Sequence, residues 1–251
     1  MISNPSFPDI YMDGMNDNNP YIYSPNVPYA IFMYQTRDTL FGDANIFVKF
    51  ISNCISRFRK RRFYTSYKAY LYDIGMDHCQ VLSNIDNTMA DLEMHHNGIT
   101  IFDITIMITY HILAIKGKVS TFDVVKELVK CHKYNEVPLV MVCKSIHQMV
   151  HNDAEFFLPA QMCFGNWDKL VKTYYRGITF GIARKLSYWI KKSIEQSDNQ
   201  DYNISLLGLR KSIENWSEYN EYHDGCYSNR NTNHDNIIDR IYKSTDSSIG
   251  W

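Results

Sequence analysis

The chain has 251 residues, of which 45% are hydrophobic and 14% aromatic, so it can bury a sizeable core and is neither fibrous nor wholly disordered. Its formal net charge of −1 hides a cationic middle, because residues 51–194 carry 19 Lys and Arg against 12 Asp and Glu, whereas both flanks are acidic. No apolar run has the roughly 18 residues of a membrane span, no secretory signal opens the chain, and the cysteines lack CxxC spacing, so we expect a cytoplasmic protein with reduced thiols and no membrane partner.

The N-terminal third of the chain predicts an arm followed by two helices. Residues 1–42 are rich in Asn, Asp, Pro and Tyr, and we expect an irregular, aromatic-rich arm without regular elements. Apolar residues at helical spacing begin at Ala44, and a second helix is predicted from Phe63 to a C-terminal cap at Gly75. Residues 43–75 therefore form a basic helical segment.

The middle of the chain predicts a strand, a helical hairpin, a second strand and a short helix. The predicted ranges are, in that order, 90–96, then 100–116 with 122–132, then 138–143, then 144–152. Gly117 ends the first hairpin helix and Ser120 caps the second. We place the core of the protein at residues 76–160.

The last part of the chain predicts helices and then a tail. Within the C-terminal helical segment, 161–222, the expected helices are 166–175, 178–195 and 206–219. Ser, Asn, Asp and Thr dominate 223–251, which predicts a disordered tail.

A basic run lies at the junction of the first two helices and is interleaved with aromatic rings. Such a run is typical of a solvated helix face, and equally of a surface that binds nucleic-acid phosphates and stacks on bases. The candidate nucleic-acid-binding residues are Arg57, Arg59, Lys60, Arg61, Arg62 and Lys68.

Histidines are concentrated between residues 78 and 151, where seven of the nine lie. His147 and His151 are four residues apart on a predicted helix, which lets both rings reach one metal ion. His95 and His96 end a predicted strand, where successive side chains point to opposite faces unless a bulge re-aims one. The order strand, strand and helix with these histidines predicts a ββα metal site.

Three short pieces give this region a resemblance to the HNH endonuclease family, in particular to its phage-encoded members. They are the stretch Leu92–Asn97 with its His pair, the stretch Asn135–Cys143, and the helix Lys144–Asn152. The resemblance implies a mostly helical α+β fold with a ββα-metal finger, an inserted helical hairpin and flanking helices. Two features depart from the family: Asn135 follows His96 at an interval of 39 positions, and no set of four zinc-binding cysteines is present.

The resemblance also implies a function, the metal-dependent hydrolysis of phosphodiester bonds in DNA, with RNA as another possible substrate. In that role His96 would be the general base, Asn135 would fix the loop that holds His96, and His95, His147 and His151 would be metal ligands oriented in part by Glu93. The sequence does not decide which of His95 and His96 would be the general base and which the metal ligand. The expected ion is Mg²⁺ or Mn²⁺, with Zn²⁺ or Ni²⁺ as alternatives, no organic cofactor is implied, and a phage-encoded member would act in the host cytoplasm.

Two other functions fit the same residues. One is an inactive HNH-fold protein that binds nucleic acid without cleaving it. The other is a structural or assembly protein, in which the histidines are packed in the core and the Tyr-rich arm is an interaction segment. Assays of metal binding, DNA binding and DNA cleavage would distinguish these three functions.

Overall fold

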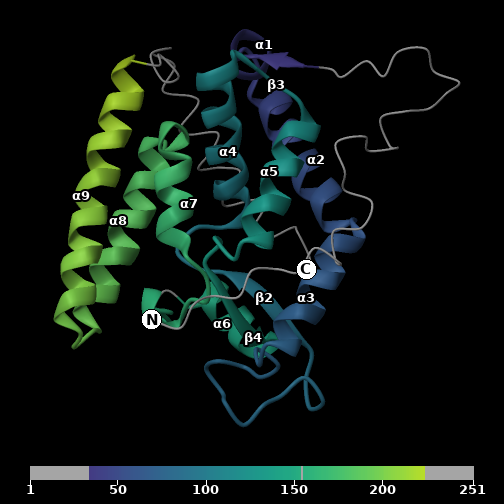
Figure 1. The fold of residues 1–251 in the computed structure, drawn as a ribbon, viewed down its shortest axis with the longest axis vertical. Coiled ribbons are helices and arrows are strands. Elements are labelled where there is room, and N and C mark those ends of the chain that lie inside the picture. The colour runs from purple at the N-terminus through teal and green to yellow at the C-terminus, as the bar shows by residue number, and fades with distance from the viewer. Residues whose placement is uncertain (1–33, 154, 224–251) are drawn as a thin grey trace, which may run out of the picture.

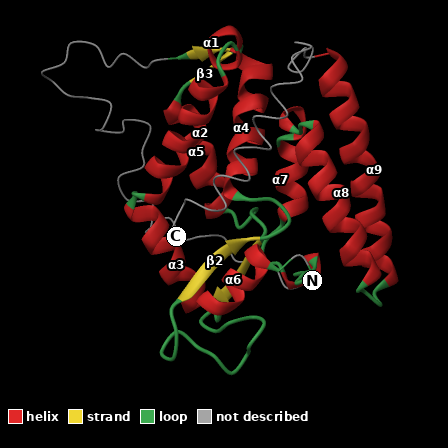
Figure 2. Cartoon of the chain, turned by 180° about the vertical axis from the view of Figure 1, so that it is seen from behind, coloured by secondary structure: helices red, strands yellow, loops and turns green. Residues whose placement is uncertain are grey.

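The computed structural model describes residues 34–153 and 155–223 and consists mainly of helices. Helices α2, α4 and α5 pack together on one flank, and α8 packs against α9 on the other (Figure 1). A two-stranded sheet and the short helix α6 lie at one end of these helices, as the reverse view in Figure 2 also shows. Among the described helices, none is both long and apolar enough to cross a membrane.

The elements in chain order are β1 (Gln35–Thr36), α1 (Arg37–Phe41), α2 (Ala44–Arg59), α3 (Arg62–Asp73), β2 (Leu92–His96), α4 (Ile101–Lys116), β3 (Lys118–Val119), α5 (Thr121–Lys133), β4 (Leu139–Cys143), α6 (Lys144–Asn152), η2 (Ala160–Met162), α7 (Trp167–Thr173), η3 (Tyr175–Gly177), α8 (Phe180–Glu195) and α9 (Gln200–His223). Buried apolar residues from α1 to α9 form one continuous core.

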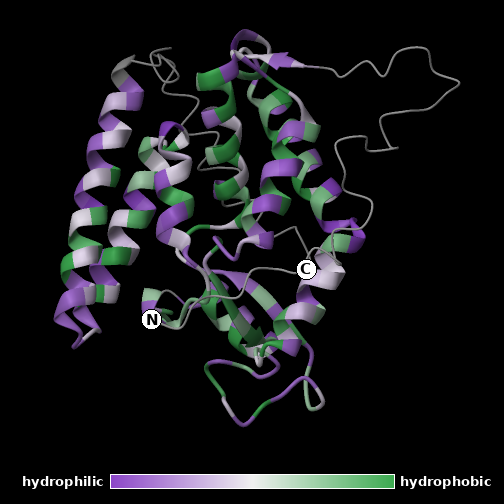
Figure 3. Ribbon diagram, viewed as in Figure 1, coloured by the Kyte–Doolittle hydropathy of each residue, from purple (hydrophilic) through white to green (hydrophobic). Residues whose placement is uncertain are grey.

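Helix α4 is the central helix of this core. It is apolar around most of its circumference, and in Figure 3 its hydrophobic residues adjoin those of the neighbouring helices, as expected for a helix surrounded by protein. Thr100 caps its N-terminus by accepting a hydrogen bond from the Asp103 amide, and Gly117 ends it with φ 69°. The local sequence therefore fixes both ends of the most buried helix.

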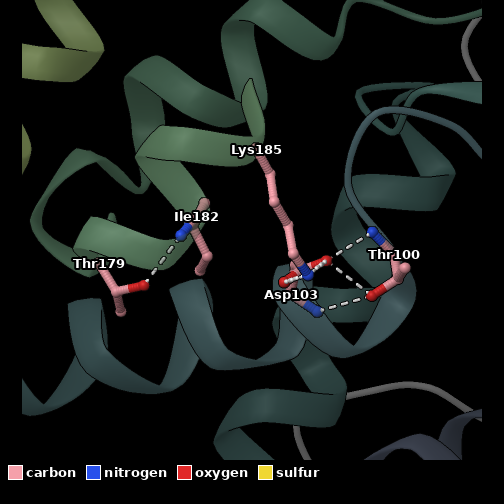
Figure 4. A network of polar contacts seen from close by, with 5 residues as sticks. All are labelled: Thr100, Asp103, Thr179, Ile182 and Lys185. Atoms are coloured by element: carbon pink, nitrogen blue, oxygen red, sulfur yellow. Dashed lines mark hydrogen bonds and ion pairs between the residues drawn. The ribbon is translucent and has the colours of Figure 1, made fainter. Parts of the chain in front are cut away.

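A buried carboxylate joins α4 to α8. Asp103 is fully buried and accepts hydrogen bonds from the amide and hydroxyl of Thr100 and from Lys185 Nζ, the last at 3.1 Å (Figure 4). Lys185 lies one turn after the start of α8, whose N-cap Thr179 accepts from the amide of Ile182. One capping carboxylate thus fixes the start of α4 and holds the two helical groups together.

The sheet that matters for the candidate site is the antiparallel pair β2–β4. Its register places Leu92 opposite Cys143 and His95 opposite Val140. All five residues of β4 are buried, and α6 begins directly after its last residue. Helices α4 and α5, with β3, lie between the two strands in sequence, and His132 of α5 contacts His96 of β2.

Most predicted elements are confirmed, including the two strands and α6 with the bounds expected for it. The expectation of no regular element in residues 1–42 is wrong where the structure describes this segment, since β1 and α1 lie there and β1 pairs with β3. Helix α9 is also longer than predicted, and the expected tail after residue 223 and the arm before residue 34 lie outside the described residues. A mostly helical α+β fold is thus confirmed, while an HNH fold is not shown.

Candidate metal centre

Two adjacent elements carry the three histidines that the sequence predicted as metal ligands. His95 lies on β2, and His147 and His151 lie one turn apart on α6, which packs against both strands. Their candidate ligand atoms all lie within 4.8 Å of one another, and no other group of three or more possible ligands is found among the described residues. The structure therefore brings these three side chains together as expected.

The rings of the three histidines are arranged around a common point. The ring centroids of His95 lie 5.1 Å from His147 and 5.4 Å from His151, and those of His147 and His151 are 4.7 Å apart. The Nε2 atoms of His147 and His151 are 3.2 Å apart. His95 and His147 are buried and His151 is exposed, so the cluster lies at the surface with two of its rings covered.

Glu93 orients one ring of the cluster. Its Oε2 lies 2.5 Å from Nδ1 of His147, and Glu93 precedes His95 by two residues on the same face of β2. A carboxylate at Nδ1 favours the tautomer that carries its proton there, which leaves the Nε2 lone pair directed at the other rings. Glu93 thus occupies the position that the sequence predicted for it.

Burial favours the uncharged form of two rings of the cluster, His95 and His147. Desolvation, followed by the neighbouring His147 and His151, lowers the pKa of His95 to about 3. Desolvation also lowers the pKa of His147, although Glu93 acts in the opposite direction. Neutral imidazole is the form that binds metal ions, so these rings need no deprotonation at pH 7.

His96 lies on the opposite face of β2 and does not join the cluster. Its Nε2 is 3.1 Å from Nε2 of His132 on α5, and His132 Nδ1 lies 2.7 Å from the carbonyl oxygen of Leu128. Burial, followed by His132, holds the pKa of His96 well below its usual value. The ring expected to act as general base is therefore part of the packing between α5 and the sheet. His132 is not among the site residues that the sequence predicted, and its contact with His96 had no signal in the sequence.

Asn135 is also separate from the cluster. Its side chain accepts a hydrogen bond from the Tyr67 hydroxyl at 2.9 Å and donates one to the Tyr70 hydroxyl at 3.2 Å. Its backbone has φ 51°, and the amides of Asn135 and Glu136 cap the end of α5 through the carbonyls of His132 and Cys131. Asn135 fixes the end of α5 and its contact with α3, rather than a loop that holds His96.

Comparison with protein-family models supplies the identity that the geometry does not. The model of the bacteriophage G278-like virion protein family matches residues 9–219, which is most of the chain. The chain belongs to this family. Comparisons with curated proteins and with solved structures find no match.

Membership in the G278-like virion protein family corrects the resemblance to HNH endonucleases. The new family covers both the residues that suggested HNH and the helices on either side, whereas the resemblance depended on three short pieces. Assignment as a nuclease, endonuclease or hydrolase is therefore not supported, although a phage origin agrees with the family. The order of strand, strand and helix suggested an HNH site because it brings three histidines together. It does not place His96 beside them, since His96 lies against His132.

The basic run of this virion protein lies at the turn between α2 and α3. Four of its interleaved rings, those of Phe58, Phe63, Tyr67 and Tyr70, are buried in the core and unavailable for stacking on bases, while Tyr64 and Tyr72 are partly buried. Arg57, Lys60 and Arg62 are exposed, whereas Arg59, Arg61 and Lys68 are partly buried, and burial lowers the pKa of Arg59. Binding of DNA by this run stays a prediction.

Proposed function

We propose that the protein is a structural component of a phage particle. The observation that carries the proposal is the match of residues 9–219 to a family of bacteriophage virion proteins. The match extends from the N-terminal arm through most of α9, so the proposed role belongs to the folded body as a whole and not to one motif.

Two features of the fold support a structural role for the protein rather than a hydrolytic activity. The buried apolar residues form one core that joins the helices on both flanks to the sheet. His96 and Asn135, the two residues to which a nuclease would give catalytic tasks, make other contacts. His96 lies within hydrogen-bonding distance of His132, and Asn135 is hydrogen-bonded to two tyrosines of that core. Each of these contacts serves the rigidity of the body.

The direct test is the protein content of purified particles. Particles are banded on a density gradient, washed at high salt, and analysed by quantitative mass spectrometry for this chain. We expect a constant number of copies per particle across independent preparations. Presence of the chain in the infected lysate together with its absence from banded particles would refute the proposal.

A folding variant supplies the matched control. In phage that lack the gene, the chain is provided in trans either unchanged or as Gly177→Leu, which forces a side chain into the α4 backbone at Met107. The unchanged chain should enter particles and the variant should not. Equal recovery of both in the particle fraction would show that the chain only co-purifies with particles, and would contradict a structural role.

A further inference from the structure

Membership in a virion protein family does not explain why three histidines of β2 and α6 lie together. We propose that His95, His147 and His151 together bind one divalent transition-metal ion of the zinc type, with Glu93 as the positioning residue and a fourth coordination place open to solvent. The inference goes beyond the structural role proposed above and does not depend on it.

The first argument is the spacing of the donor atoms. Nitrogen ligands at about 2.0–2.1 Å from a tetrahedral ion are about 3.3 Å from one another. The Nε2 atoms of His147 and His151 are 3.2 Å apart, which agrees with this separation. The ligand atoms of all three residues lie within 4.8 Å of one another, so the third nitrogen is close enough to reach the same ion after a small closing movement.

The second argument is the arrangement of the rings. Three imidazoles on one tetrahedral ion have their ring centres about 5 Å apart, because each centre lies roughly 3 Å beyond the metal along its bond. The observed centroid separations of 5.1, 5.4 and 4.7 Å follow this pattern for all three pairs. A pair of histidines joined only by a hydrogen bond gives no reason for the third ring to lie at the same separation.

The third argument is the tautomer of His147. Glu93 Oε2 lies 2.5 Å from Nδ1 of His147, and a carboxylate at that distance favours the tautomer with the proton on Nδ1 and the lone pair on Nε2, the atom that lies 3.2 Å from His151 Nε2. The same contact between a carboxylate and a ligating histidine is common beside zinc in proteins, where it fixes the ring and raises its basicity. Glu93 therefore prepares His147 as a ligand without itself entering the ligand set.

The donor set determines the class of ion. Three imidazole nitrogens suit Zn²⁺, Co²⁺, Ni²⁺ and Cu²⁺, whereas Mg²⁺, Mn²⁺ and Ca²⁺ prefer carboxylate, carbonyl and water oxygens. The sequence favoured Mg²⁺ or Mn²⁺ on the strength of a nuclease mechanism. The geometry reverses that order, and the exposed His151 leaves one side of the ion accessible to water or to a small anion.

The effect of the ion is to fasten α6 to the sheet. Without it, α6 is a helix of nine residues with no side-chain cap at its N-terminus. Bonds from the ion to two α6 residues and to one β2 residue join segments that are more than 50 residues apart in sequence. Binding should therefore raise thermal stability, by about 5–10 °C when the free ion is at 100 times the dissociation constant.

The test uses the full chain without an affinity tag, freed of metal by a chelator. Calorimetric titration with Zn²⁺, and visible spectra of the Co²⁺-loaded protein, measure stoichiometry, affinity and coordination number. We expect one ion per chain, a tetrahedral Co²⁺ spectrum that changes when azide is added, and a higher melting temperature with Zn²⁺. Absence of Zn²⁺ binding by the unchanged chain would overturn the proposal.

Three variants make the assignment specific. His151→Asn changes an exposed ligand and should lower Zn²⁺ affinity by more than tenfold, while Glu93→Gln should lower it about 10–100-fold with the stoichiometry kept. His78→Asn changes a half-exposed histidine in the loop before β2 and serves as the control. Circular dichroism confirms that each variant is folded. Equal affinity in His151→Asn and His78→Asn would show that this cluster is not the site, whatever the outcome of the particle analysis.

Discussion

Asn135 gives the sharpest test of how the end of α5 is held. Replacement by Ala removes the acceptor of the Tyr67 hydroxyl and the donor to the Tyr70 hydroxyl, both of which lie in the core. It also puts an ordinary residue at φ 51°, a left-handed conformation that Asn tolerates and Ala does not. Replacement by Gly removes the same two hydrogen bonds but relieves the backbone.

The magnitude follows from these separate contributions. Losing one hydrogen-bond partner costs a buried hydroxyl about 1–3 kcal/mol. Because Tyr67 and Tyr70 keep other contacts, the lower part of that range, about 1–2 kcal/mol each, applies, and the two tyrosines together account for roughly 2–4 kcal/mol. The left-handed backbone adds about 1 kcal/mol for Ala. We therefore expect Asn135→Ala to lose about 3–5 kcal/mol, and Asn135→Gly to be more stable than Asn135→Ala by about 1 kcal/mol, the reverse of their order inside a helix.

Urea denaturation followed by circular dichroism measures both differences. For a body of this size, 3–5 kcal/mol corresponds to a fall of about 10 °C in melting temperature. Zn²⁺ affinity should not change, because Asn135 is not one of the clustered ligands. A loss below 1 kcal/mol in Asn135→Ala, or greater stability of Asn135→Ala than of Asn135→Gly, would refute the reasoning.

Two further predictions concern packing and pH. A Cβ at Gly177 would lie 1.7 Å from the carbonyl oxygen of Met107, so Gly177→Ala should destabilise the protein by about 2–3 kcal/mol or more. At Gly181 in α8 an added Cβ would meet only the Thr179 hydroxyl, at an ordinary contact distance of 3.8 Å, so Gly181→Ala should be neutral or slightly stabilising. Differential scanning calorimetry compares the two variants, and equal melting temperatures would contradict the contact at Gly177. Burial lowers the pKa of His132 to about 4 in the folded chain, against about 6.5 when unfolded. Between these two pKa values only the unfolded chain binds the proton, so His132 alone should lower the free energy of unfolding by about 2 kcal/mol from pH 7 to pH 5. In His132→Gln the decrease between the two pH values, measured by urea denaturation at each, should be smaller by this amount. An identical fall in the variant would exclude His132 as the cause.

The elements of the middle of the chain could be predicted because their local signals are strong. The capping pairs Thr100–Asp103 and Ser120–Asp123, with Gly117 between the helices, mark the hairpin of α4 and α5 in the sequence itself. The apolar run of β4 and the pattern of α6 are equally local. By contrast, β1 and β3 are two residues each and exist only as a pair between segments more than 80 residues apart, so no local pattern marks them.

The candidate site could be predicted in part for a similar reason. The spacing of His147 and His151 is a property of one helix, and the alternation of Glu93 and His95 is a property of one strand. The contact between His96 and His132 depends on how α5 packs on the sheet, which the sequence near either residue does not encode. The family, likewise, is a property of most of the chain and not of three short pieces within it.

The two histidines at the end of β2 explain both the success and the error of the sequence interpretation. A pleated strand sends neighbouring side chains to opposite faces, so His95 faces α6 while His96 faces α5. A motif that treats the two as a pair predicts three ligands and a base around one ion. The strand instead supplies one histidine to the cluster and one ring to the packing against α5, so His96 does not lie beside the three clustered rings. If the cluster binds a metal ion as proposed, its loss should weaken the attachment of α6 to the sheet while the packing around His96 stays in place.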